Sequence, residues 1–349
     1  MKAARICGDQ DKTKPNECYR KAHFNNLRAL AMKATIILPC YNSEATIGEQ
    51  MEALARQSWR DDWEFILADN GSTDRSVEIV QSHADRIPNM RILNVYSGSG
   101  PRAPASASYN KAFAAAKSDI FITCESDDVV GDGWLAKMVA AMEHAHFVGS
   151  AIDDYKLNSS DLIRPGEGMQ TREAGFANFI GPLKLPFAVG ACIGISRELW
   201  ETVGDFDEEI GHLWDIDISW RAQLAGYDLE FVPDALLYYR QRTTFKGRYK
   251  QGKMYGQSSS RIVAKYGRRS IFRYLAFNVY HLGVGSLFLI ASVLPWTRSP
   301  RHRVWRVANA IGQLQGIKFV LGGRRKVIEI PERLKPLTKA RPKHAGESQ

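Results

Sequence analysis

Residues 35–57, TIILPCYNSEATIGEQMEALARQ, and residues 63–74, WEFILADNGSTD, decide the fold. The run at 35–40 is short, apolar and rich in β-branched residues, which is typical of a buried strand. Residues 43–57 place apolar side chains at helical spacing, and residues 63–68 form a second apolar run. A strand, a helix and a strand in this order predict a βαβ unit with its two strands parallel.

The alternation of strands and helices continues along the chain. Further strands are predicted at 91–96, 120–124, 147–152 and 229–232, and further helices at 74–84, 106–117, 134–143 and 215–225. A stretch containing Gly and Pro, up to about residue 186, interrupts the rhythm before the apolar residues 187–195. We therefore predict an α/β fold with a mostly parallel, twisted sheet flanked by helices.

The composition is that of a compact globular protein. Of the 349 residues, 44% are hydrophobic and 24% charged, which excludes disorder and collagen-like repetition. The 47 basic and 38 acidic residues leave a net charge of +9, which favours an anionic partner such as nucleic acid, a phosphorylated metabolite or an acidic membrane surface. The basic residues cluster toward the carboxyl end beside an apolar segment, without a nucleic-acid recognition module. We therefore expect membrane lipid as the anionic partner and no nucleic acid.

The cysteines and the amino terminus indicate a cytosolic protein. Five cysteines, odd in number and widely spaced, predict free thiols in a reducing compartment and no zinc site. They are Cys7, Cys18, Cys40, Cys124 and Cys192. Residues 1–33 contain no apolar core that could serve as a signal peptide, and we expect 1–32 to form a loose arm.

Two predicted strands end in acidic residues, at the edge where an open parallel sheet presents its ligand site. Asp69 follows one of them, and Gly71 permits a tight turn directly after it. The carboxylate could accept a hydrogen bond from a ligand. The alternative is a turn that only caps the next helix.

The second acidic end is Glu125-Ser126-Asp127-Asp128. Three carboxylates in four residues repel one another, and no adjacent Lys or Arg relieves them. A divalent cation would relieve them, since hard cations prefer oxygen ligands and Mg²⁺ takes one or two carboxylates together with substrate phosphates. The alternative is a solvated acidic turn. A third pair, Asp215 and Asp217, lies two residues apart at a predicted helix start, so the two side chains need not share a role.

Four ordered motifs between about residues 35 and 248 together resemble the family-two glycosyltransferases with the GT-A fold. The motifs are TIILPCYN with Glu44 just after it, ADNGSTD, ESDD, and WDIDISWRAQLAGYDLEFVP. The resemblance implies transfer of a sugar from a nucleotide-diphosphate donor to an acceptor hydroxyl, with inversion at the anomeric carbon. It implies a UDP-, dTDP- or GDP-sugar as donor, a glycan or lipid-linked acceptor, and a role in cell-surface polysaccharide or glycolipid synthesis.

The resemblance also implies roles for individual residues. Asp215 would be the catalytic base, and Glu125, Asp127 and Asp128 would hold Mg²⁺ or Mn²⁺. Nucleotide-binding residues would be Pro39, Tyr41, Glu44, Asp69, Asn70, Glu125 and Asp127. Diphosphate contacts, with a solvated surface as the alternative, would be Arg240, Arg242, Lys246 and Arg248.

The chain departs from the family pattern at Asn70, Glu125 and Trp214, where the family usually carries Asp, Asp and Glu. These departures keep open a catalytically impaired, GT-A-like nucleotide-sugar-binding protein as the alternative function. An oxidoreductase on a Rossmann fold is disfavoured, because G-x-G-x-x-G is absent after the first strand. A nucleotidyltransferase is disfavoured, because no Gly-rich loop with Lys or Arg follows that strand.

The predicted organisation has a GT-A domain at 33–250, with a nucleotide-binding half at 33–130 and an acceptor half at 131–250. A basic and apolar helical region at 251–330 would associate with the membrane, and 331–349 would be a disordered tail. Residues 274–297 carry no Asp, Glu, Lys or Arg, and a span needs roughly 20 apolar residues. Polar residues inside the segment and arginines on both flanks favour helices that lie on the cytosolic leaflet, which gives a peripheral protein. A single span and a buried hairpin are the alternatives.

Overall fold

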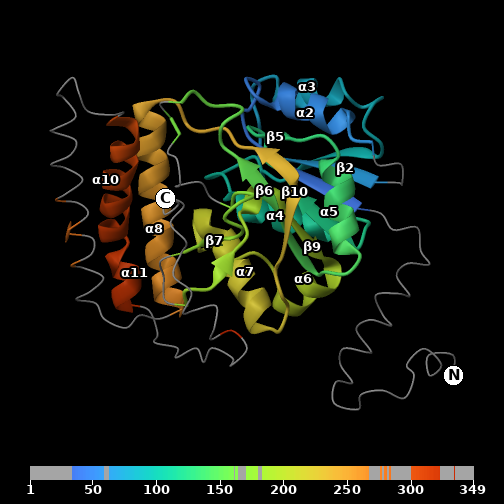
Figure 1. Ribbon diagram of the computed structural model, residues 1–349. Coiled ribbons are helices and arrows are strands. Elements are labelled where there is room, and N and C mark those ends of the chain that lie inside the picture. The colour runs from blue at the N-terminus through green and yellow to red at the C-terminus, as the bar shows by residue number, and fades with distance from the viewer. Residues whose placement is uncertain are drawn as a thin grey trace, which may run out of the picture.

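The computed structural model has an eight-stranded sheet with helices on both faces, and a pair of long helices beside it (Figure 1). The structure describes residues 34–58, 63–160, 162–163, 170–179, 183–266 and 300–322, and the single residues 276, 279, 280, 283 and 334. The predicted arm at 1–32 lies outside this part of the chain, as does the predicted tail at 331–349 apart from residue 334.

The sheet has the strand order β3-β2-β1-β4-β9-β6-β10-β5. Its strands are β1 (Ala34–Cys40), β2 (Trp63–Asp69), β3 (Met90–Asn94), β4 (Ile120–Thr123), β5 (Val129–Val130), β6 (Phe147–Asp153), β9 (Ile193–Ser196) and β10 (Glu230–Tyr238). A separate pair consists of β7 (Ala177–Asn178) and β8 (Pro186–Phe187).

The prediction of a mostly parallel sheet is correct for one half of it. Strands β3, β2, β1 and β4 run parallel to one another, and β6 runs parallel to β10. Strand β9, however, enters between β4 and β6 and runs antiparallel to both, and β5 is antiparallel to β10. All four residues of β9 are buried. A short strand buried on both faces carries no alternation from which its direction or place could be predicted, so the sheet is mixed.

Six helices of the sheet domain cover its two faces. They are α2 (Ile47–Ala55), α3 (Ser76–Gln81), α4 (Ala105–Ala115), α5 (Trp134–Met142), α6 (Arg197–Val203) and α7 (Trp214–Leu224). Apolar residues of β1 and β2 that face one way pack with α2 and α5, and those that face the other way pack with α4 and α6. This two-sided burial makes the strands near-continuous apolar runs, which is why they could be recognised in the sequence.

The first long helix, α8 (Phe245–Tyr266), begins directly after the sheet domain, and the second is α10 (Pro300–Gln315). The short helix α11 (Ile317–Gly322) follows α10. The domain boundary predicted between residues 250 and 251 falls inside α8. Within the described residues, no helix is both long enough and apolar enough to cross a membrane. The segment 274–297 lies almost wholly outside those residues.

Candidate functional site

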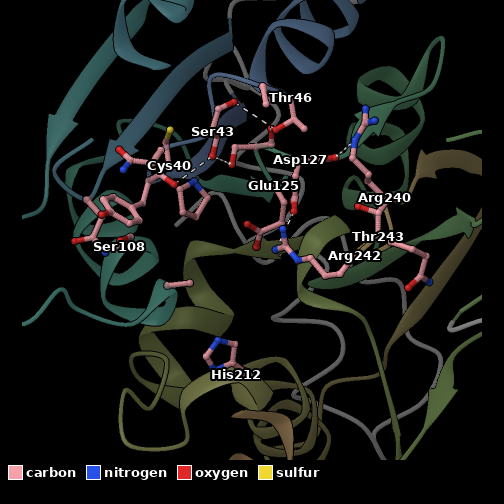
Figure 2. Close-up of a pocket in the computed structure, with 18 residues that line it drawn as sticks. Cys40, Ser43, Thr46, Ser108, Glu125, Asp127, His212, Arg240, Arg242 and Thr243 are labelled. Carbon is pink, nitrogen blue, oxygen red and sulfur yellow. Dashed lines mark hydrogen bonds and ion pairs between the residues drawn. The ribbon is translucent and has the colours of Figure 1, made fainter. Parts of the chain in front are cut away.

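Two adjoining cavities open at the carboxyl ends of β1 and β4. The first cavity has a volume of about 580 Å³ and the second of about 540 Å³. Both are lined by Ala105, Glu125, Asp127, His212 and Arg242. Figure 2 shows Glu125, Asp127 and Arg242 gathered together, with His212 on the side away from them. The two cavities therefore form one cleft with acidic and basic groups at its junction.

The first cavity is walled by the turn that follows β1. This turn is tied to the turn after β2, because Asn42 Oδ1 accepts a hydrogen bond from the Thr73 N–H at 2.8 Å and the Ser43 N–H donates to Ser76 Oγ at 2.7 Å. Of the residues predicted here, Pro39 and Tyr41 line the cavity. Glu44 accepts instead from the Arg75 N–H at 3.0 Å and is not among the lining residues.

Asp69 is buried in its own turn. Its carboxylate accepts hydrogen bonds from the backbone N–H groups of Gly71 and Ser72, at 3.2 and 3.1 Å. Gly71 has φ +78°, and a Cβ there would collide with the ring of Tyr96. Asn70, next in sequence, lines the first cavity. The observed contacts of Asp69 are those of a turn cap, and its contact with a nucleotide stays a prediction.

Arg102 covers the exposed ring of Tyr41. Its guanidinium lies 4.0 Å from the centroid of the Tyr41 ring and 5.1 Å from that of Tyr96. It also donates to the carbonyl oxygens of Asn70 and Gly71, both at 3.1 Å. The sequence carried no signal for this stack, because Tyr41 comes from the segment after β1 and both Tyr96 and Arg102 from the segment after β3.

Glu125 lies at the junction of the cavities and accepts a hydrogen bond from the Tyr109 hydroxyl at 2.9 Å. Burial, and next the charge of Asp127, raise the pKa of Glu125 to about 8. Asp128 is also buried, and burial raises its pKa well above the ordinary value. One of its oxygens accepts the Arg240 N–H at 2.8 Å. The other, Oδ2, has no hydrogen-bond partner in the described part of the chain.

Two arginines lie beside the acidic cluster, although the sequence has no basic residue adjacent to it. Arg242 forms an ion pair with Asp127 at 3.0 Å, and the Arg240 side chain donates to the Asp127 carbonyl oxygen at 2.8 Å and to Glu49 at 2.9 Å. These arginines lie more than 110 positions further along the chain, so only the fold could show this relief of charge.

The donor atoms of the cluster suit a hard cation, although no complete protein cage is present. Within the described residues, no three His, Cys, Asp or Glu side chains converge closely enough to hold a metal ion. The unpartnered Oδ2 of Asp128 and the carboxylate of Asp127 nevertheless offer oxygen atoms of the kind that hard cations prefer beside the cavity. A Mg²⁺ ion commonly takes one or two carboxylates and completes its shell with phosphate oxygens and water. The cluster fits a metal held jointly with a diphosphate.

Asp215 lines the second cavity from the first turn of α7. Its carboxylate accepts hydrogen bonds from the backbone N–H groups of Gly190, at 3.1 Å, and Ile216, at 2.9 Å. Burial raises its pKa to about 6, and these two hydrogen bonds oppose part of that rise. The carboxylate is therefore mostly ionised at neutral pH while being more basic than an ordinary Asp. It has the properties of a general base.

Trp214 belongs to the core, next to Asp215. Its ring lies 4.9 Å from that of Tyr109 and 4.7 Å from that of Phe206, centroid to centroid. Gly190 is required beside it, because an added Cβ would collide with the indole. The aromatic residue that departs from the family pattern is thus accommodated by packing.

Asp217 has no surface in either cavity. Its carboxylate is fully buried and pairs with Arg221 at 2.9 Å and with Lys265 at 2.7 Å, and it accepts from the Tyr266 hydroxyl at 2.7 Å. The two aspartates at the start of α7 therefore have separate roles, as their spacing indicated, and Asp217 joins α7 to α8.

The predicted basic run is only partly at the site. Arg240 and Arg242 line the first cavity, and Arg242 also lines the second. Lys246 is exposed and lines neither cavity, and buried Arg248 donates to the Arg242 carbonyl oxygen at 2.8 Å. Five further lining residues of the second cavity lie on α8 and are absent from the predicted site. Their helical spacing was the available signal, and they are Gly247, Lys250, Gln251, Met254 and Tyr255.

Two protein-family models together match most of the described chain. Residues 35–204 match the model of glycosyl transferase family 2. Residues 120–312, which are more than half of the chain, match the model of glycosyl transferase family group 2.

Two curated relatives are similar over part of the sequence. The poly(ribitol-phosphate) beta-glucosyltransferase of Bacillus spizizenii is 36% identical over 103 residues, which are 29% of this chain and 16% of that protein. The poly(ribitol-phosphate) beta-N-acetylglucosaminyltransferase TarS of Staphylococcus aureus is 29% identical over 117 residues, 33% of this chain and 20% of that one. The match therefore spans a fifth or less of the length of these relatives.

Among solved structures, the mannosyltransferase PcManGT of Pyrobaculum calidifontis, in complex with GDP-Man and Mn²⁺, superposes with a TM-score of 0.53. The two chains are 15% identical, and the match covers 85% of this chain and 93% of the other. At this identity the likeness shows the fold alone. It confirms the predicted α/β fold of GT-A type, with its sheet between layers of helices.

Proposed function

The chain belongs to glycosyl transferase family 2, and from this premise we propose that it transfers a sugar from a nucleotide-diphosphate donor to an acceptor hydroxyl, with inversion. One observation carries the proposal. A basic, half-buried carboxylate, Asp215, faces the second cavity, while Asp127 and Arg242 stand where that cavity joins the first.

The donor would occupy the first cavity. The base of the donor would lie near Tyr41 and Asn70. The Asp69 carboxylate, which caps its own turn, would also contact the base. The diphosphate of the donor would lie at the junction, beside Arg242 and Glu125. A nucleotide sugar fits a cavity of about 580 Å³, which falls within the usual range of small-molecule sites.

The acceptor would occupy the second cavity, with its hydroxyl beside Asp215. As the acceptor oxygen attacks the anomeric carbon, Asp215 would take the hydroxyl proton. The bond to the diphosphate breaks at the same time, and Arg242 would stabilise the negative charge that the leaving oxygen gains. Because attack and departure take place on opposite sides of the carbon, the configuration at that carbon inverts.

A divalent metal would be held by Asp127 together with Glu125 or Asp128. When bound, it supplies positive charge to the diphosphate. The proposal is supported by the unpartnered oxygen of Asp128 and by the raised pKa values of Glu125 and Asp128, since these buried carboxyls lack sufficient positive charge around them.

We expect UDP-, dTDP- or GDP-sugars to raise the unfolding temperature in the presence of Mn²⁺, and Asp127→Ala to abolish this rise. A ligand at 100 times its Kd stabilises the fold by about 2.7 kcal/mol, which a thermal-shift screen detects. The matched control is Asp132→Ala, which removes an exposed carboxylate from outside both cavities. Equal stabilisation of the Asp127→Ala variant, or of the unmodified protein in excess EDTA, would contradict the metal assignment.

We place the activity in cell-surface polymer synthesis, on the cytosolic face of the membrane. The names of the two curated relatives support a polymer as the acceptor, and the net charge of +9 suits an anionic lipid surface. Cell fractionation should recover the unmodified chain with the membranes, and alkaline carbonate should release at least part of it. A chain found wholly in the soluble fraction would exclude this attachment.

A further inference from the structure

Helix α8 forms a wall of the second cavity with one of its faces. The residues of α8 that line the cavity recur at intervals of three and one, which places them on one side of a helix. They are Gly247, Lys250, Gln251, Met254 and Tyr255. The position of this helix therefore sets the width of the second cavity.

A different face of α8 packs against α10, with the two backbones in contact. A Cβ at Gly252 would collide with the carbonyl oxygen of Trp305, one at Gly256 with that of Asn309, and one at Gly312 with that of Lys253. Gly252 meets Trp305, Gly256 meets Asn309, and Ser260 meets Gly316, so the contacts advance in the same direction along both helices. The helices are therefore parallel, and Figure 1 shows the two side by side. This close approach exists because both helices have glycine at the contact.

Polar contacts fix the register of the two helices. Ser260 Oγ donates to the Gln313 carbonyl oxygen at 3.0 Å, and Gln257 donates to the Gln315 side chain at 3.1 Å. A shift of α10 along α8 would break both. The contacts with α10 thus fix both the axial position of α8 and the distance between the two helices.

Helix α8 is also held by contacts with the sheet domain. Its last turn is tied to α7 by Lys265 and Tyr266, both bonded to Asp217, and Ser258 Oγ accepts the His212 N–H at 3.0 Å. The cavity-lining half of α8, residues 245–255, lies before these anchors.

Tyr255 connects the cavity to α10 directly. Its ring lines the second cavity and stands 5.8 Å from the ring of His212, which lines both cavities. On its other side it stands 6.2 Å from the ring of Trp305 on α10. A displacement of Trp305 would therefore shift Tyr255 and change the wall of the second cavity.

We propose that α10 positions the acceptor wall of the enzyme, and that Gly256, Gly312 and Trp305 are positioning residues for acceptor binding. The inference rests on the proposed function, because it takes the second cavity as the acceptor site. It gives the carboxyl-terminal helices a role in recognition that is separate from membrane attachment. Helix α8 contributes none of the residues that line the first cavity, so we expect its displacement to weaken acceptor binding and to leave donor binding at the wild-type level.

The test is Gly256→Ala, measured with the donor found in the thermal-shift screen and with a glycan and glycolipid extract of the source cells as the acceptor. The added methyl group forces the helices apart, so the extract concentration that gives half-maximal transfer should rise about 10-fold, or 1.4 kcal/mol. The half-saturating donor concentration should stay at the wild-type value. An unchanged half-saturating extract concentration would overturn the inference.

Two further variants keep the test decisive. Gly48→Ala on α2 is the matched control, because a Cβ there meets only Ile79 Cγ2, at 3.7 Å, and it should leave both concentrations unchanged. If Gly256→Ala does not fold, Trp305→Leu removes the ring that supports Tyr255 and should raise the extract concentration in the same way. A wild-type protein that transfers no sugar with any extract would instead contradict the proposed function.

Discussion

Asp215→Asn is expected to lower turnover by about 10²- to 10⁴-fold, the usual effect of losing a general base. The substitution keeps the shape of the side chain, and its amide oxygen can still accept the N–H of Gly190 or Ile216. Donor affinity should therefore stay at the wild-type value, because Asp215 does not line the first cavity. Turnover assays with the donor from the thermal-shift screen measure the effect.

The pH dependence gives this prediction a second readout. The base is active when ionised, so kcat/KM of the wild type should rise with pH around a midpoint near 6, the raised pKa of Asp215. The same raised pKa predicts that Asp215→Asn does not lower thermal stability. A folded-state pKa above the ordinary 3.8 favours the neutral carboxyl, and the stability gained from this form is lost as pH rises through about 6. At neutral pH the ionised group costs stability, and Asn removes that cost. A variant that keeps wild-type turnover would show that Asp215 is not the base.

Asp217→Asn should have the opposite profile, with a large loss of stability. The fully buried carboxylate pairs with Arg221 and Lys265, and loss of one partner from a buried ion pair costs about 3–5 kcal/mol. We expect the lower end, about 3 kcal/mol, because Lys265 keeps Asp207 as a partner at 2.7 Å and both cations are partly exposed. Urea unfolding at neutral pH measures it.

The pair of variants separates chemistry from structure. Folded Asp217→Asn protein should retain most of its turnover at low temperature, since Asp217 touches neither cavity. Loss of turnover in folded Asp217→Asn, together with retained turnover in Asp215→Asn, would show that Asp217 is the base and Asp215 is not. If both variants lost stability and kept their turnover, both aspartates at the start of α7 would have a structural role only.

Much of the sheet could be predicted because its strands are apolar runs bounded by turns. The predictions for 35–40 and 63–68 match β1 and β2 to within one residue. The place of β9 could not be predicted, because a four-residue strand buried on both faces is consistent with either direction. The boundary predicted between residues 250 and 251 divided helix α8 between two regions, because its mixture of glycines, serines and basic residues conceals that one face lines the second cavity and another packs against α10.

The acidic residues of the site could be predicted because they follow buried strands. Glu125 and Asp127 do lie at the cleft, and so does Asp215. Their charge balance could not be predicted, since Arg242 reaches Asp127 from a distant part of the chain. The distinction between Asp215 and Asp217 likewise depends on Lys265 and Tyr266, which a local motif does not include.

Release of nucleoside diphosphate, measured with and without acceptor, tests the proposed glycosyl transfer most directly. With the donor from the thermal-shift screen, the wild-type protein should release nucleoside diphosphate faster as the glycan and glycolipid extract is added, and Asp215→Asn should abolish most of the increase. A protein that binds the donor but releases no nucleoside diphosphate with any extract would contradict the account, and would instead be a nucleotide-sugar-binding member of the family.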